Sequence, residues 1–147
     1  MESSPEVEVR RAELEREAPV VVRGIWKRTR LDDADVVFLC GTIGAEFDVW
    51  QRRLSVLSAA DALLSQQIGL DAVEKVMDDL EKRLRLEVEV EGRKLKPRRS
   101  PGYGDLPLEL SRRILDELDA TKKIGVSITD SNLLVPSKSV TAICEIC

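Results

Sequence analysis

Ten consecutive residues, 98 to 107, carry the side chains of this chain that are best suited to hold a small ligand. The segment reads Arg98-Arg99-Ser100-Pro101-Gly102-Tyr103-Gly104-Asp105-Leu106-Pro107. Glycine lets a backbone approach a ligand closely, and proline fixes the path of the chain. An arginine offers a planar fork to a carboxylate, and a tyrosine offers a ring and a hydroxyl. The sequence therefore predicts a rigid binding loop just before a helix.

The chain contains no histidine, which restricts the chemistry it could perform. Histidine is the commonest general base and a common metal ligand. A Ser–His–Asp triad and a Cys–His pair are therefore impossible. Any catalysis must come from a bound cofactor, from carboxylates or from positioning alone, and a hydrolase ranks last among the candidate functions.

Length and composition predict one globular domain over residues 1–147, in which residues 1–17 form a flexible or helical arm. Apolar residues make up 43% of the chain and charged residues 34%, while aromatic residues make up only 3%, so we expect an aliphatic core. The net charge of −4 argues against nucleic-acid binding. No apolar run approaches the roughly 20 residues that span a membrane. The polar N-terminus lacks a signal-peptide pattern, and we expect a cytoplasmic protein.

The three cysteines, Cys40, Cys144 and Cys147, do not suggest a disulfide framework. Cys40 lies in an apolar run and is expected in the core. Cys144 and Cys147 have the spacing of half a metal site but no second pair. We favour the interpretation that Cys144 is buried in a strand and that Cys147 is an unpaired residue near the end.

Hydrophobic periodicity predicts a set of strands and helices along the chain. Gly69 is expected to cap the end of one helix and Asp71 the start of the next. Residues 86–90 also alternate like a strand, which is the alternative to a helix there. The expected strands are 20–26, 36–40, 124–128 and 140–146. The expected helices are 45–54, 56–69, 71 to about 89, and one that begins at Pro107.

Five of the seven residues from Arg93 to Arg99 are basic. One interpretation is a solvated face that offsets the acidic helix before it. The other is a strand that faces an anion and leads into the loop at residues 100–103. The two interpretations are compatible, because some side chains can be solvated while one reaches a ligand.

Four segments resemble one known family. In chain order they are Val37–Glu46, residues 98–107, Ile124–Ser131 with its Thr129-Asp130-Ser131, and Pro136–Val140. Together they resemble the activation domain of cobalamin-dependent methionine synthase, and most of all its short stand-alone versions, over about residues 34 to 147. The resemblance implies an α+β fold in which helices pack on a curved, mostly antiparallel sheet.

The resemblance also implies a ligand and partners. The family domain binds S-adenosylmethionine in a shallow groove and supports reductive remethylation of the cobalamin of methionine synthase. Carried over by motif, Arg98 pairs with the ligand carboxylate, Gly102 allows the backbone approach, and Tyr103, Ser100 and Pro101 line the site. No residue is implied as catalytic or as a metal ligand. The implied partners are a cobalamin-dependent methionine synthase or another corrinoid protein, and a flavodoxin- or ferredoxin-like electron donor.

The family's acidic ligand contact has no clear counterpart among Glu2–Glu17 or Asp32–Asp35. Two other functions stay open at this point. One is a non-catalytic partner that docks on a corrinoid protein without binding S-adenosylmethionine. The other is an unrelated anion-binding module that uses Arg93–Arg99.

Overall fold

The computed structural model describes residues 4–147 and is built around a three-stranded antiparallel sheet. The strands are β1 (Arg23–Leu31), β2 (Ala34–Thr42) and β5 (Ser139–Glu145), in the order β1-β2-β5. A second sheet pairs the short strands β3 (Ser127–Ile128) and β4 (Leu134–Val135). The helices are α1 (Pro5–Glu17), α2 (Ala45–Leu57), α3 (Ala59–Val90), α4 (Leu110–Leu118) and α5 (Ala120–Ile124).

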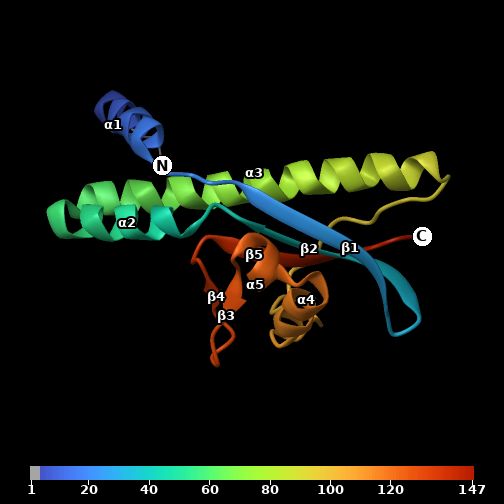
Figure 1. Ribbon diagram of the computed structural model, residues 1–147. Coiled ribbons are helices and arrows are strands. Elements are labelled where there is room, and N and C mark those ends of the chain that lie inside the picture. The colour runs from blue at the N-terminus through green and yellow to red at the C-terminus, as the bar shows by residue number, and fades with distance from the viewer. Residues whose placement is uncertain (1–3) are drawn as a thin grey trace.

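Helices cover both faces of the three-stranded sheet. Figure 1 shows α3 running along one face, with α4 and α5 on the other. This arrangement confirms the predicted α+β class with helices packed on an antiparallel sheet. Among the helices of the described residues, none is long and apolar enough to cross a membrane.

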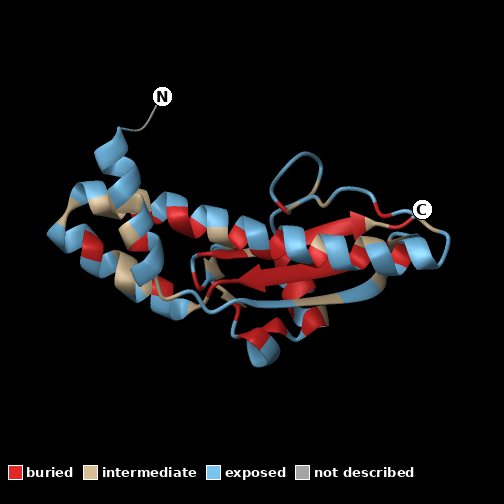
Figure 2. Cartoon of the chain, turned by 90° about the horizontal axis from the view of Figure 1, so that it is seen from above, coloured by how far each residue is buried: buried red, intermediate tan, exposed pale blue. Residues whose placement is uncertain are grey.

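Strand β2 is buried on both sides, and its alternating side chains divide the core into two layers. Val37 and Leu39 pack in the cluster that includes α3. Val36, Phe38 and Cys40 pack against α4 and α5. Figure 2 shows β2 and β5 as the buried centre of the molecule. The prediction of a buried central strand at 36–40 is confirmed.

Helix α3 is one continuous helix of 32 residues, so the predicted break at Gly69 and Asp71 is wrong. Ser58 begins it by accepting a hydrogen bond from the amide of Asp61 at 3.2 Å. Gly69 is a packing residue rather than a cap, because a Cβ there would lie 2.7 Å from the ring of Phe47. The helix continues to Val90, which confirms the helical interpretation of residues 86–90.

Three other predicted boundaries are also wrong. The strand expected at 20–26 begins at Arg23 and continues to Leu31, because β1 pairs with the whole length of β2. Ile124 ends α5, so only Ser127 and Ile128 remain of the strand expected at 124–128. Pro107 precedes α4, which starts at Leu110. The strand predicted at 140–146 and the helix predicted at 45–54 are present as β5 and α2.

The N-terminal arm is helical over the described part of residues 1–17. Helix α1 is docked on α3 by few contacts. Leu14 is its one buried residue. The guanidinium of Arg10 donates to both carboxylate oxygens of Asp61, at 3.1 and 2.8 Å. A second ion pair, between Arg11 and Asp71, joins the same helices, so charged side chains around Leu14 hold α1 on α3.

The Arg10–Asp61 pair predicts an acid-sensitive contribution to stability. The hydrogen bond from Arg10 holds the pKa of Asp61 below its usual range. A carboxyl with a depressed folded-state pKa stabilises the fold above its unfolded pKa, about 4, and this contribution is lost as pH falls through the folded value. We expect Asp61→Asn to lower the free energy of unfolding at neutral pH and to approach the wild type in acid. Urea unfolding across pH measures this, and a difference that does not change with pH would contradict it.

The close packing around Gly69 predicts a second, local effect on stability. Gly69→Ala raises helix propensity by about 1 kcal/mol, but overpacking a close-packed site costs about 1–3 kcal/mol. The added Cβ would also lie 2.9 Å from Cε of Lys138, so two neighbours must move. We expect a net loss of stability in thermal or urea unfolding. Glu89→Ala, on the exposed end of the same helix, is the control and should have little effect. A Gly69→Ala protein more stable than the wild type would refute this account.

Candidate ligand-binding site

The segment before the predicted loop covers one part of the outer edge of β5. The amide of Lys94 donates to the carbonyl of Cys147 at 2.9 Å, and the amide of Lys96 donates to the carbonyl of Glu145 at 2.9 Å. Arg99 and Ile143 exchange two backbone hydrogen bonds of 2.9 and 2.8 Å. The chain then leaves β5 at Ser100, so the earlier residues of the strand are not covered by this segment.

The predicted loop is held by its own backbone. The amide of Gly102 donates to the carbonyl of Leu106 at 2.9 Å, and the amide of Tyr103 donates to the carbonyl of Ser100 at 3.3 Å. Gly102 has φ +92°, a conformation that residues with a Cβ adopt only under strain. Pro101 is buried beneath it, whereas the side chain of Tyr103 is 75% exposed. The loop is therefore compact and presents its ring outward.

A groove of about 890 Å³ opens where the loop leaves β5. This volume lies within the usual range of small-molecule sites. Its lining includes Ser139, Val140 and Thr141 of β5. The direction of the backbone groups alternates along a strand, and those of Ile143 point outward to Arg99. The amide and carbonyl of Thr141, two residues earlier, therefore also point outward, toward the groove. The remaining lining residues are Leu70, Val73 and Glu74 of α3, Arg98–Pro101, Tyr103–Asp105, Leu108, Ser111, Asn132–Leu134 and Ser137.

Arg98 is already engaged by carboxylates of α3. Its guanidinium lies 2.6 Å from Glu74, 2.8 Å from Asp78 and 3.3 Å from Glu81. The amide of Arg98 also donates to Glu81 at 3.2 Å. With a side chain only 18% exposed, Arg98 ties the loop to α3. Glu81 also pairs with Arg85 at 3.1 Å, so the cluster holds three carboxylates and two guanidinium groups.

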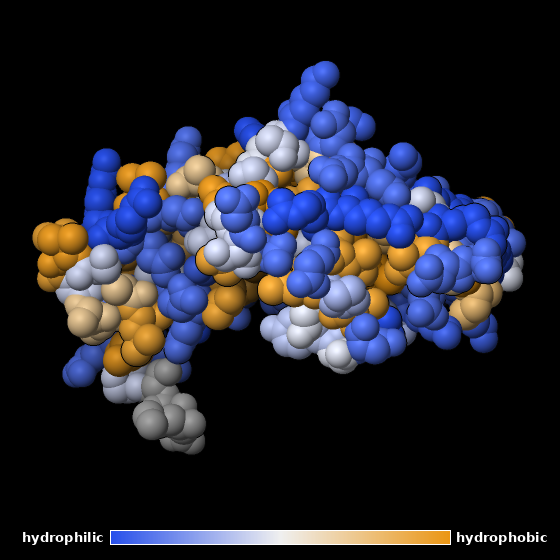
Figure 3. Space-filling model, turned by 90° about the horizontal axis from the view of Figure 1, so that it is seen from below, coloured by the Kyte–Doolittle hydropathy of each residue, from blue (hydrophilic) through white to orange (hydrophobic). Residues whose placement is uncertain are grey.

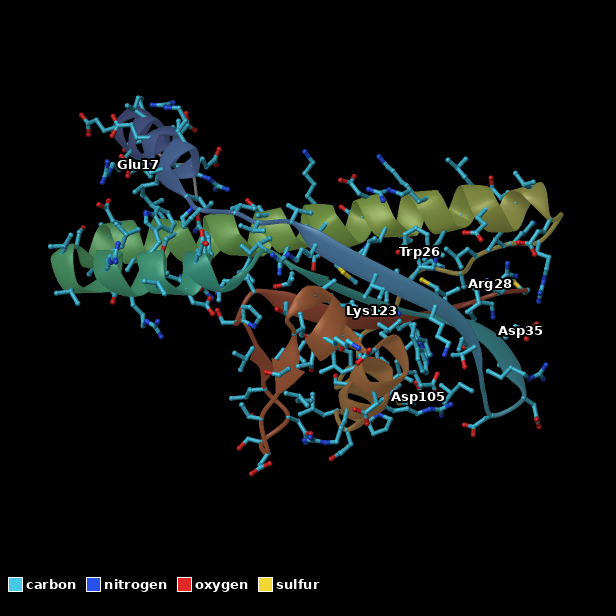
Figure 4. All side chains as sticks on the ribbon, viewed as in Figure 1. Glu17, Trp26, Arg28, Asp35, Asp105 and Lys123 are labelled. Carbon is cyan, nitrogen blue, oxygen red and sulfur yellow. The ribbon has the colours of Figure 1, made fainter. Side chains whose placement is uncertain are left out.

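Arg99 has a much weaker partner. Its guanidinium lies 3.4 Å from the carboxylate of Asp105, and the two side chains are 47% and 83% exposed. Figure 4 shows Asp105 beside α4, on the opposite side of the sheet from α3. The pair is long and solvated, and such pairs contribute about 0–1 kcal/mol.

The structure brings four of the five predicted site residues to the groove. Arg98, Ser100, Pro101 and Tyr103 line it, and Gly102 shapes the loop without lining it. The Pro136–Val140 segment contributes three further lining residues. Among the described residues 4–17 and 32–35, none lines the groove, and Glu2 lies outside the described residues.

Sequence reasoning missed the α3 wall of the groove, because no local signal marks it. Leu70, Val73 and Glu74 lie in the middle of an ordinary amphipathic stripe. Glu74 and Asp105 are the acidic residues that line the groove, and neither was singled out. Asp105 lies within the loop sequence, but Glu74 is 24 residues before Arg98 and meets it only through folding.

The basic segment at 93–99 is largely neutralised by neighbouring carboxylates. Arg93 pairs with Asp35 at 3.0 Å, and Lys96 pairs with Glu145 at 3.2 Å. With Arg98 and Arg99 paired as described, four of its five basic residues have acidic partners. This distribution favours a solvated, internally balanced face over a surface that faces an anion.

The cysteines lie apart from the groove lining. Cys144 is buried in β5, and Cys147 is exposed, as the sequence predicted. Two residues three apart on an extended chain point to opposite faces, so their side chains are badly placed to share an ion. Burial raises the pKa of Cys40 and of Cys144 to about 12 in each case, and both thiols stay protonated at neutral pH.

Comparison with known proteins identifies one structural relationship. No protein-family model matches the chain, and no curated protein matches its sequence significantly. Its structure is similar to the crystal structure of the MetH reactivation domain bound to AdoHcy, with a TM-score of 0.76 and 15% sequence identity. The match covers 95% of this chain and 63% of that chain, so this chain spans just under two thirds of that structure. The α+β fold is therefore that of the MetH reactivation domain.

The Arg98 cluster predicts a stability effect. Arg98→Met removes the cation shared by Glu74, Asp78 and Glu81, of which only Glu81 keeps another partner, Arg85. Losing charged hydrogen bonds costs about 1.5–3 kcal/mol. We expect the free energy of unfolding to fall by this order in chemical denaturation. The double variant Arg98→Met with Glu74→Gln should recover part of the loss. If the two substitutions prove additive, the proposed coupling between these side chains does not exist.

Proposed function

We propose that this chain is an S-adenosylmethionine-binding domain that supports reductive remethylation of the cobalamin of a methionine synthase. The observation that carries the proposal is the groove between α3, β5 and the Arg98–Asp105 loop, on the fold of a domain solved with AdoHcy. AdoHcy is S-adenosylmethionine without its sulfonium methyl group. A groove that holds one is expected to hold the other.

The groove offers a partner for each part of such a ligand. Apolar side chains of Leu70, Val73 and Val140 flank a site for a planar ring, and the backbone edge at Thr141 supplies a donor and an acceptor for adenine. Glu74 supplies a carboxylate for the ligand ammonium. The loop residues Arg98, Ser100, Pro101 and Tyr103 line the groove, and Gly102 shapes the loop that carries them.

The absence of histidine is compatible with this chemistry. Bound S-adenosylmethionine supplies an electrophilic methyl group, and transfer of that group to a strong nucleophile requires no proton transfer by a side chain. Positioning alone accelerates such a step greatly. The residues of this chain therefore bind and orient the ligand. The cobalamin belongs to a partner, a methionine synthase or another corrinoid protein, with a flavodoxin- or ferredoxin-like protein as electron donor.

Calorimetry with AdoHcy and S-adenosylmethionine tests the proposal, and two glycine variants sharpen the result. Gly102→Ala strains a loop residue at φ +92° and places a Cβ 3.2 Å from the end of the Leu108 side chain, which can move. Gly92→Ala strains a residue at φ +77° that has no neighbour within 4 Å of an added Cβ. Each substitution costs about 1–2 kcal/mol of backbone strain. We expect both to lose similar stability, but only Gly102→Ala to lose affinity for the two ligands.

The possible results separate clearly. A wild-type protein that binds neither AdoHcy nor S-adenosylmethionine would refute the proposed function. Equal loss of affinity in both glycine variants would show that binding does not depend on the Arg98–Asp105 loop in particular.

A further inference from the structure

The outer edge of β1 is the longest unpaired sheet edge among the described residues. In the order β1-β2-β5, this strand pairs with β2 on one side only, over all 9 of its residues. The opposite edge of the sheet, along β5, is partly covered by residues 94–99 and otherwise borders the groove. Figure 2 shows β1 largely exposed beside the buried β2 and β5. An exposed edge of this length is a template on which another strand can pair.

The alternation of backbone groups along β1 determines which of them face outward. The amide of Ile146 donates to the carbonyl of Asp35 at 2.9 Å, so the backbone groups of Asp35 face β5 and those of Val36 face β1. Val36 is paired with Thr29, so Thr29 and every second residue before it face β2. The residues between them, whose N–H and C=O groups point away from the sheet, are Gly24, Trp26, Arg28 and Arg30.

These outward groups are almost all left without a protein partner. The guanidinium of Arg113 donates to the carbonyl of Arg30 at 3.0 Å, which agrees with the outward direction of that carbonyl. Within residues 4–147, no other hydrogen bond reaches the outward amides and carbonyls of β1. A regular row of donors and acceptors is therefore available along most of the strand, as in sheets that bind a peptide by strand addition.

The edge carries positive charge, which is balanced only near the hairpin. β1 contains four basic residues and no acidic one. Arg28 pairs with Glu91 of α3 at 2.5 Å, and Arg30 pairs with Asp35 at 3.5 Å. The turn that follows adds the exposed carboxylates of Asp32 and Asp33. The half of β1 next to the hairpin is therefore close to neutral.

The first half of β1 keeps its positive charge. Arg23 and Lys27 form no ion pair with any carboxylate of the described residues. Lys123, labelled in Figure 4, is another cation without such a pair and lies on α5, which packs against β1. Charge complementarity therefore favours an acidic occupant. A second copy of this chain would bring the same cations to the edge, and basic residues on edge strands oppose such pairing.

We propose that the outer edge of β1 binds an extended acidic segment of a partner protein, which joins the three-stranded sheet as a further strand. Main-chain hydrogen bonds to the outward groups hold the segment, and Arg23, Lys27 and Lys123 select acidic side chains. The surface is separate from the groove, because β2 and β5 lie between them. The inference is therefore independent of the proposed function.

A short synthetic peptide in which glutamate and valine alternate is the probe for strand addition. Added to the full chain, it should produce saturable shifts in the NMR spectrum. Amide hydrogen exchange should become slower at Gly24, Trp26, Arg28 and Arg30, and should change little at the residues between them, which β2 already protects. The same peptide with lysine in place of glutamate should not bind.

Two substitutions at one position separate the backbone from the charge. Arg28→Pro removes an outward N–H without removing a donor to β2, and proline is tolerated at such edge positions. Arg28→Ala removes the same charge and keeps the N–H, so it is the matched control. We expect Arg28→Pro to bind the acidic peptide about threefold to tenfold more weakly than Arg28→Ala, the loss typical of one hydrogen bond. Circular dichroism verifies that both variants are folded.

A second pair of variants tests the charge. Lys27→Ala should weaken binding of the acidic peptide about twofold to fivefold, the range expected for one exposed ion pair. Lys94→Ala removes an exposed lysine at the opposite edge of the sheet and should leave the affinity unchanged. Equal effects of these two substitutions would contradict the role given to the cations of β1.

Three results would overturn the inference itself. The absence of saturable shifts with the acidic peptide would show that the edge does not accept a strand. Binding without slower exchange at the outward amides would show that the peptide is held by charge alone. A wild-type dimer in sedimentation, with these amides already protected, would show that a second copy occupies the edge. None of these results depends on whether AdoHcy binds in the groove.

Discussion

Backbone groups on the outer edge of β5 need hydrogen-bond partners, and the chain provides them over only part of the strand. Residues 94–99 pair with the end of β5 and the two residues after it, from Ile143 to Cys147, and the chain then turns away at Ser100. The edge at Ser139–Thr141 is left facing a groove. An edge that is open but recessed between a helix and a loop is protected from pairing with other strands and is available to a ligand. The position of the groove follows from the point at which pairing stops.

The continuity of α3 is the second condition for the site. At 32 residues the helix is about 48 Å long, so a single rigid element reaches from α2 to the β1–β2 end of the sheet. Its middle provides the Leu70–Glu74 wall, and its next turns provide Asp78 and Glu81 for Arg98. A break at Gly69 would separate the part of the helix that packs on α2 from the part that forms the groove. The close approach of Phe47 to Gly69 instead locks α2 against the unbroken helix.

Charge on this molecule is arranged mainly as internal pairs. Arg10 meets Asp61, Arg93 meets Asp35, and Arg98 meets the acids of α3. Apolar surface remains exposed elsewhere. Figure 3 shows it at the α2–α3 end of the molecule, where Val56 and Leu57 are almost fully exposed. The number of basic residues in a segment therefore overstates the positive charge of its surface, because carboxylates from distant segments pack beside those residues.

The sequence by itself determined the features that depend on neighbouring residues. The continuous apolar run at 36–40 and the alternation along 140–146 predicted the strands β2 and β5. Periodic apolar residues predicted α2 and most of α3, and the glycines and prolines after Arg99 predicted a tight loop. Only the tertiary structure decided that the helix passes through Gly69, that Glu74 forms a wall of the groove, and that Arg98 contacts three carboxylates while Arg99 pairs only with the exposed Asp105. Local patterns reflect steric and hydrophobic preferences within a few residues. The partners of a charged side chain depend instead on which distant segments pack beside it, and this is fixed only when the whole core closes.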